Sequence, residues 1–150
     1  MIEKKPMSVD QIATRSFIDT NVLIYAEACD EPVKQRAALA LLKQLFEGAW
    51  GVLSTQVLQE YCSVALKKLQ LPASHIRAQL DFYEQFEVIQ VTPAIIHAGL
   101  DLQQTRSVGF YDAIIVASAQ VAGCSVLLSE DLNAGEAMAS VRIINPFAGL

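Results

Sequence analysis

The chain has 150 residues, of which 53% are hydrophobic, and its 16 acidic residues outnumber 11 basic residues to give a formal net charge of −5. This length and this supply of apolar side chains predict one compact domain with a substantial core, and they exclude a mainly disordered chain. The longest apolar stretch, residues 113–122, is interrupted by Ser118 and Gln120 and is far shorter than the roughly 20 residues of a membrane-spanning helix.

Residues 1–15 form a polar N-terminal extension of open role that lacks the apolar stretch of a secretory signal, and we expect a single domain over residues 16–150. The cysteines are odd in number and widely spaced, which indicates buried thiols in a reducing compartment: Cys29, Cys62 and Cys124. With only two histidines besides, the chain has no plausible set of zinc ligands. We therefore expect a cytoplasmic protein that does not bind a membrane.

Short apolar runs alternate with segments of helical spacing along the whole chain. Between residues 32 and 46, for example, Val33, Ala37, Leu41 and Leu45 recur at every fourth position, as on one face of an amphipathic helix. In chain order, the pattern predicts a strand at 16–18, helices over 22–26 and 32–46, a strand at 52–53, helices over 56–69 and 72–86, a strand at 88–91, helices over 92–104 and 112–122, and strands at 125–128 and 142–144.

The order of these elements predicts the fold class. Strands that alternate with helices are typical of a parallel sheet covered by helices on both faces, and the sequence contains no tight-hairpin signal such as Asn-Gly. The last predicted helix is apolar nearly all round, so we expect it to be buried. The sequence therefore predicts an α/β fold.

In such a fold ligands bind beyond the carboxyl ends of the strands, where two acidic residues stand, and two further acids lie in helices. Asp19 follows the strand at 16–18, and Asp131 comes shortly after the strand at 125–128. Asp112 opens the buried helix, and Glu60 lies on the flank of the apolar stripe of its own helix. The spacing of these residues leaves two interpretations open.

In the simpler interpretation each acid serves only its own surroundings. Asp19 and Asp112 would cap helices, Asp131 would belong to a polar turn, and Glu60 would be a surface residue. In the other, the four meet in one cleft, where each ionised pair about 5 Å apart would cost about 3 kcal/mol at an effective dielectric constant of about 20. Such a cluster needs cations, and oxygen ligands select Mg²⁺ or Mn²⁺.

Four blocks of sequence, each containing one of these acids, resemble the blocks that mark PIN-domain ribonucleases. They are Phe17-Ile18-Asp19-Thr20-Asn21-Val22-Leu23-Ile24-Tyr25, Leu53-Ser54-Thr55-Gln56-Val57-Leu58-Gln59-Glu60, Tyr111-Asp112-Ala113-Ile114-Ile115-Val116, and Leu127-Leu128-Ser129-Glu130-Asp131-Leu132-Asn133. The chain most closely resembles the VapC branch, the toxins of type II VapBC toxin–antitoxin systems. The likeness covers residues 16–147, including a closing block over residues 141–147.

This resemblance implies a three-layer PIN-like fold with a parallel sheet of about five strands, and a Mg²⁺-dependent endoribonuclease site in which Mn²⁺ is a possible substitute. By similarity, Asp19, Glu60, Asp112 and Asp131 would be the catalytic acids and metal ligands. Asn21 and Ser129 would orient the carboxylates as supporting residues. Glu130 ranks second to Asp131 for the fourth acidic position.

The resemblance also implies partners. These are an RNA substrate of unspecified kind, a cognate antitoxin that lays a helix or extended segment across an apolar groove, and a second copy of the chain in a homodimer. The net negative charge fits poorly with RNA binding, although scattered basic residues could rim a substrate groove if they do not simply form solvated faces: Lys34, Arg36, Lys43, Lys67, Lys68 and Arg106.

Two other functions compete with a nuclease. A PIN fold kept as a protein-interaction module, with weak or no nuclease activity, would suit the acidic charge and the unexplained N-terminal extension. An Asp-dependent phosphatase would need an acid where Asn21 stands, and a phospho-receiver would need a lysine after the strand at 125–128, where none follows. We therefore expect a nuclease, with the interaction module as the alternative.

Overall fold

The structure is a computed structural model that describes residues 12–132 and 137–150. Within these residues the strands are β1 (Ser16–Ile18), β2 (Gly51–Ser54), β3 (Glu87–Ile89), β4 (Val126–Leu128), β5 (Ala137–Met138) and β6 (Val141–Ile144). They form one sheet in the order β3-β2-β1-β4-β6-β5. The parallel strands β3, β2, β1, β4 and β6 confirm the predicted parallel sheet of about five strands.

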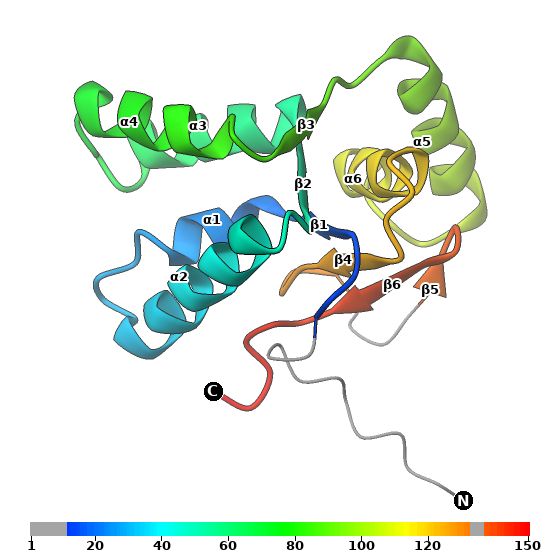
Figure 1. The fold of residues 1–150 in the computed structure, drawn as a ribbon. Helices are drawn as coiled ribbons and strands as arrows, with labels where there is room; N and C mark the ends of the chain where they lie inside the picture. The colour runs from blue at the N-terminus through cyan, green and yellow to red at the C-terminus, as the bar shows by residue number, and fades with distance from the viewer. Residues whose placement is uncertain (1–11, 133–136) are drawn as a thin grey trace, which may run out of the picture.

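Helices cover both faces of this sheet. They are α1 (Thr20–Tyr25), α2 (Pro32–Glu47), α3 (Thr55–Lys67), α4 (Ala73–Tyr83), α5 (Pro93–Thr105) and α6 (Phe110–Val121). Helices α1 and α2 lie on one side of the sheet and α5 and α6 on the other, while the α3–α4 pair stands above α1 and α2 (Figure 1). This arrangement confirms the predicted α/β fold class.

The centre of the sheet is buried because its strands are apolar on both faces. Phe17 of β1 lies opposite Val52 of β2 on one side and Leu127 of β4 on the other, and all three are fully buried. Helix α6 covers this centre and is buried nearly all round, as predicted. It packs closely on α5 at Gly99, where a Cβ atom would stand 2.4 Å from the Ile114 side chain.

The edge strand β5 was not predicted. It pairs antiparallel with β6 through a tight turn whose two central residues, Ala139 and Ser140, both have positive φ angles, 50° and 68°. Asn and Gly usually occupy such turns, because they adopt this conformation at little cost. The expectation of a sheet without a hairpin is therefore wrong at this edge, where Ala-Ser replaces the usual signal.

The expectation of buried thiols holds for only one of the cysteines. Cys124 is buried, but Cys62 is half-buried and Cys29 is exposed, and all three are free thiols. Of the N-terminal extension, residues 12–15 are described: Ile12 is buried in the core and Arg15 forms an ion pair with Glu87 at 2.5 Å. The remaining extension lies outside the described residues. No helix in the described ranges is long and apolar enough to cross a membrane.

Candidate active site

The pairing of β1 with β4 brings together two segments that are far apart in the sequence. Ile18 and Leu128 lie opposite each other as the last residues of these parallel strands, so Asp19 and Ser129 leave the sheet side by side. The Ser129 hydroxyl donates a hydrogen bond to Asp19 Oδ2 at 2.7 Å. The sheet topology therefore places the first and last of the quoted sequence blocks side by side at the carboxyl ends of the two central strands.

Asp19 both caps helix α1 and contacts the polar side chains that follow β4. Its Oδ1 accepts a hydrogen bond from the Thr20 backbone N–H at 2.7 Å, as the N-cap of α1. Its Oδ2 accepts from Ser129 and, at 3.3 Å, from the Asn21 side-chain amide. The carboxylate is only 6% exposed. The two interpretations of Asp19 are thus compatible, because each oxygen serves one of them.

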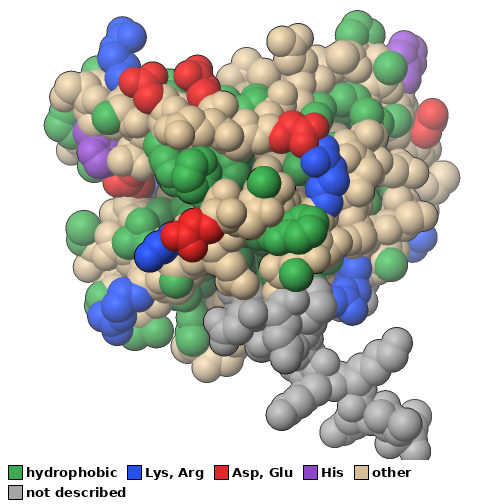
Figure 2. Space-filling model, in the orientation of Figure 1, with side chains coloured by type: hydrophobic (Ala, Val, Ile, Leu, Met, Phe, Trp, Pro, Cys, Tyr) green, Lys and Arg blue, Asp and Glu red, His purple; other side chains and the backbone are tan. Residues whose placement is uncertain are grey.

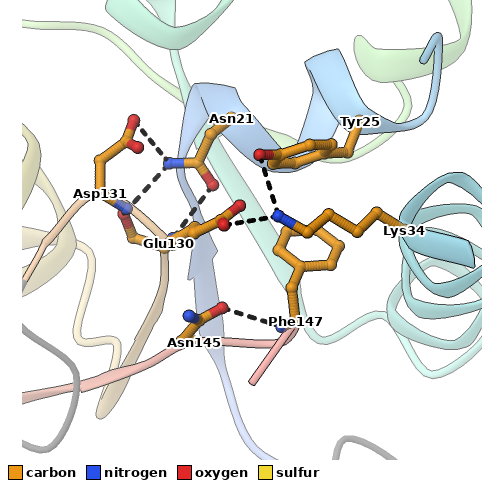
Figure 3. A network of polar contacts seen from close by, with 8 residues as sticks. Asn21, Tyr25, Lys34, Glu130, Asp131, Asn145 and Phe147 are labelled. Atoms are coloured by element: carbon orange, nitrogen blue, oxygen red, sulfur yellow. Dashed lines mark hydrogen bonds and ion pairs between the residues drawn. The ribbon is translucent and has the colours of Figure 1, made fainter. Parts of the chain in front are cut away.

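Asn21 links the acids of β1 and β4. Its Nδ2 atom lies 3.3 Å from Asp131 Oδ2 and 3.2 Å from Ser129 Oγ, and its Oδ1 accepts from the Glu130 backbone N–H at 3.2 Å (Figure 3). Ser129 Oγ also accepts from the Asp131 backbone N–H at 3.2 Å. Asn21 and Ser129 therefore lie between Asp19 and Asp131, and their role as supporting residues stays a prediction.

Glu60, on α3, approaches the same carboxyl ends of the central strands and contacts Thr20. The Thr20 hydroxyl donates to Glu60 Oε2 at 2.5 Å, and Gln56, one helical turn before Glu60, donates to Oε1 at 2.9 Å. Gln56 also donates to the Tyr111 backbone carbonyl at 3.2 Å, which ties α3 to the start of α6. The sequence reasoning did not single out Thr20 or Gln56, although both stand in the quoted blocks and Gln56 has the i, i+4 spacing to Glu60.

Asp112 lies in the first turn of α6, and the cap of that helix is Gly109, which has no capping side chain. The alternative that Asp112 is an N-cap is therefore wrong. Asp112 is exposed as a whole, but partial desolvation of its carboxyl group raises its pKa first, and the negative charges of Glu60 and Asp131 raise it as well. Its carboxylate thus shares the electrostatic environment of the other acids, from an element on the opposite face of the sheet.

The same mutual repulsion acts on Asp19. The pKa of Asp19 is raised to about 6, first by burial and also by the charges of Glu60 and Asp112, against hydrogen bonds from Ser129 and Thr20 that lower it. These couplings join four carboxylates whose residues are scattered along the sequence. A shifted carboxyl pKa within such a cluster is typical of a functional site.

The chemistry of the donors suits a hard divalent cation, because every candidate ligand offers oxygen. One amide oxygen at the site, Gln56 Oε1, is buried and has no hydrogen-bond partner. Among the residues that the structure describes, however, no group of three or more Asp, Glu, His or Cys side chains is already gathered as a metal site. The residues fit the ion in donor type, and metal binding stays a prediction.

A groove of about 490 Å³ runs beside the acids. Its lining includes two of the four acids, Glu60 and Asp131, together with their hydrogen-bond partners Thr20 and Asn21. The rest comes from α1, the segment that follows it, α3 and the residues just after α3: Ile24, Tyr25, Ala28, Asp30, Glu31, Val64, Lys68 and Leu69. Hydrophobic side chains are exposed between the α3–α4 pair and the α1–α2 pair (Figure 2). The groove thus joins an apolar surface to the acids.

A sequence model of the PIN domain matches residues 16–137, so the chain belongs to the PIN domain family. No curated protein matches the sequence. The fold is similar to that of a toxin–antitoxin complex from Klebsiella pneumoniae, with a TM-score of 0.65, 23% identity, and coverage of 88% of this chain and 98% of that chain.

Two further solved structures share this fold. VapBC2 from Rickettsia felis, bound to a DNA fragment from its promoter, has a TM-score of 0.63 and 17% identity, and covers 85% of this chain and 96% of that chain. VapC20 from Mycobacterium tuberculosis, a toxin that cleaves the sarcin–ricin loop, has a TM-score of 0.60 and 18% identity, with coverage of 77% and 91%. The chain therefore has the fold of VapC proteins along nearly its whole described length.

Proposed function

We propose that this protein is a Mg²⁺-dependent endoribonuclease and the toxin of a type II toxin–antitoxin pair. The observation that supports the proposal is the charge coupling of Asp19, Glu60, Asp112 and Asp131 near the carboxyl ends of the central strands, with the buried Asp19 repelled by two of its neighbours. A fold has no structural need for uncompensated charge of this kind, whereas a cation-dependent active site does.

In this proposal the four acids hold Mg²⁺, or Mn²⁺ in its place. When bound, the cation would supply the positive charge that activates a water molecule and stabilises the leaving oxygen of a phosphodiester. Attack of that water on phosphorus would break the bond to the 3′ oxygen, which would take up a proton, and would leave 5′-phosphate and 3′-hydroxyl ends. Ser129 and Asn21 orient the Asp19 carboxylate through their hydrogen bonds to Oδ2.

Cleavage of total cellular RNA by the purified chain, with and without Mg²⁺, tests this function. We expect wild-type protein to cut RNA only when the metal is present, and Asp19→Asn to lose that activity. Asp81→Asn is the matched control, because Asp81 is an exposed acid on α4. Equal cleavage by Asp19→Asn and the control would refute the nuclease assignment. A wild type that neither cuts RNA nor binds Mg²⁺ would favour the interaction module.

An antitoxin is the partner that the groove suits best. Apolar residues such as Ile24 and Val64 line the groove beside Glu60 and Asp131, so an apolar peptide segment bearing a basic side chain would cover both surfaces. Co-expression with the product of the neighbouring reading frame should yield a complex in which RNA cleavage is suppressed. A stable protein that ignores this product would contradict the toxin role and leave the nuclease role standing.

A homodimer in the cytoplasm completes the proposal. The exposed apolar residues of α5, Ile96 and Leu100, offer surface for symmetric pairing. Light scattering on the purified chain should give a mass of about twice 16.4 kDa. A monomer across micromolar concentrations would remove the dimer from the proposal.

A further inference from the structure

Two consecutive acids at the end of β4 point in different directions. Asp131 faces Asn21 at the site, whereas the Glu130 side chain turns toward α2 and accepts a hydrogen bond from Lys34 Nζ at 2.7 Å (Figure 3). The lysine and the glutamate form an ion pair whose side chains are only 22% and 25% exposed. Glu130 is therefore held away from the acidic cluster, and Lys34 compensates its charge.

Aromatic side chains enclose this ion pair. Lys34 Nζ lies 4.6 Å from the centre of the Tyr25 ring and 3.3 Å from the Tyr25 hydroxyl. The Tyr25 ring packs on Phe147, with 4.7 Å between ring centres, and the Phe147 backbone N–H donates to Asn145 Oδ1 at 2.8 Å. Tyr25 of α1 thus links Lys34 of α2 to Phe147 of the segment after β6.

Glu130 is also connected directly to the site. Its backbone N–H donates to Asn21 Oδ1, and the amide of the same Asn21 donates to Asp131, Ser129 and Asp19. The side chain of Glu130 therefore fastens the chain next to Asp131 to Lys34 of α2, while the backbone N–H of Glu130 orients Asn21. Movement of Glu130 would therefore shift both the backbone that precedes Asp131 and the Asn21 amide that donates to Asp131.

We propose that Lys34 and Glu130 are positioning residues, which hold the Ser129–Asp131 segment so that Asp131 faces the metal site. The inference rests on the proposed function and deepens it. It gives Lys34 a role other than RNA contact, because its ammonium group is engaged by Glu130 and Tyr25. It also separates the roles of the two neighbouring acids, with Asp131 a metal ligand and Glu130 an anchor.

The experiment compares wild type, Lys34→Met, Lys34→Arg and the control Lys43→Met. Lys43 lies on the same helix and pairs with Glu47 at 3.9 Å, but those side chains are 75% and 64% exposed. Calorimetry measures Mn²⁺ affinity, and cleavage assays give kcat and KM for RNA separately. We expect Lys34→Met to lose about 10- to 100-fold in Mn²⁺ affinity and kcat with little change in KM, the loss typical of second-sphere substitutions. Lys34→Arg should restore most of it.

The outcomes distinguish this inference from the proposed function. If Lys34→Met matches Lys43→Met in Mn²⁺ affinity and kcat, the positioning role is wrong although the nuclease stands. If wild type neither binds Mn²⁺ nor cuts RNA, the proposed function fails, and amide exchange at residues 129–132 decides: faster exchange in Lys34→Met alone supports the anchor, and equal exchange refutes it. Should Lys34→Met not fold, Glu130→Gln replaces it, with the same expected direction and a smaller loss.

Discussion

One carboxylate lies near each end of α1, and the two have opposite electrostatic surroundings. Glu27, just after the helix, has a side chain only 11% exposed and is fully partnered: Tyr61 donates to it at 3.0 Å, and His75 Nε2 lies 2.9 Å and 3.0 Å from its two oxygens. Asp19, just before the helix, is still more buried, but its ionised neighbours are the acids Glu60 and Asp112.

The difference separates an acid that stabilises the fold from one that the fold tolerates. The Glu27 cluster ties the end of α1 to α3 and α4 through the hydrogen bonds of Tyr61 and His75. Among the described residues, Asp19 receives neutral hydrogen bonds and no compensating positive charge, so in the metal-free protein its ionisation opposes folding. Active sites often keep such an uncompensated charge because it serves activity, although it lowers the stability of the fold.

Substitution of the site acid should give the largest effect. In Asp19→Asn we expect RNA cleavage to fall by at least about a hundredfold, more than the loss of a second-sphere residue, because a proposed metal ligand is removed. Without metal, the variant should unfold at a higher urea concentration than wild type at pH 7, because the repelled charge is gone. A variant that is both active and no more stable would place Asp19 in the same category as Glu27.

Substitution of the partnered acid should do the reverse. Glu27→Ala leaves the Tyr61 hydroxyl without its acceptor and should lower the free energy of unfolding by about 2–3 kcal/mol, since hydrogen bonds to a charged group are lost. Urea unfolding at pH 7 measures this change. Cleavage per folded molecule should stay within about twofold of wild type. A loss of cleavage as large as that of Asp19→Asn would show that the two acids are not separate in function.

The raised pKa of Asp19 predicts how pH acts on the site. Its folded value of about 6 lies above the ordinary value of 3.8, so protonation favours the folded state. The associated stability is fully present below about pH 4 and is lost as the pH rises through 6, an interval worth about 3 kcal/mol. Metal binding requires the ionised form, so Mn²⁺ affinity should fall about tenfold for each pH unit below 6. Calorimetry between pH 5 and 7.5 checks this slope, and a flat profile would contradict it.

The smallest effect is expected at the exposed member of the partnered cluster. The His75 side chain is 40% exposed, so its contact with Glu27 is largely screened by solvent. His75→Ala should lower the free energy of unfolding by about 0.5–1 kcal/mol and leave Mn²⁺ affinity unchanged. A thermal melt and a calorimetric titration on the same sample measure both. A change in metal affinity would mean that the clusters communicate along α1.

Much of the fold was predictable because its signals are local. Helical spacing predicted α2, and short apolar runs predicted the five parallel strands within a residue or two of their ends. The β5–β6 hairpin was missed because Ala139 and Ser140 adopt a turn that their residue types do not favour. The exposure of Cys29 was missed as well, because a lone cysteine gives no signal of its surroundings.

The sequence allowed a prediction of the residues of the candidate site but not of their contacts. The four acids and their order came from resemblance, while the approach of Asp19 and Asp131 depends on β1 pairing with β4, which no local pattern encodes. The partners of Glu60 and Glu130 were also missed. Thr20 and Glu60 stand 40 positions apart and Lys34 and Glu130 stand 96 apart, so only the folded chain shows these pairs.

The two edges of the sheet bear on how copies of this protein assemble. The edge strands β3 and β5 have three and two residues, and the Glu87 carboxylate of β3 is engaged by Arg15. Such short borders offer few free backbone groups for a neighbouring chain to extend, which protects the protein from fibrous association. In the proposed homodimer we therefore expect the two copies to meet through their helical surfaces, which would leave the sheet of each copy separate.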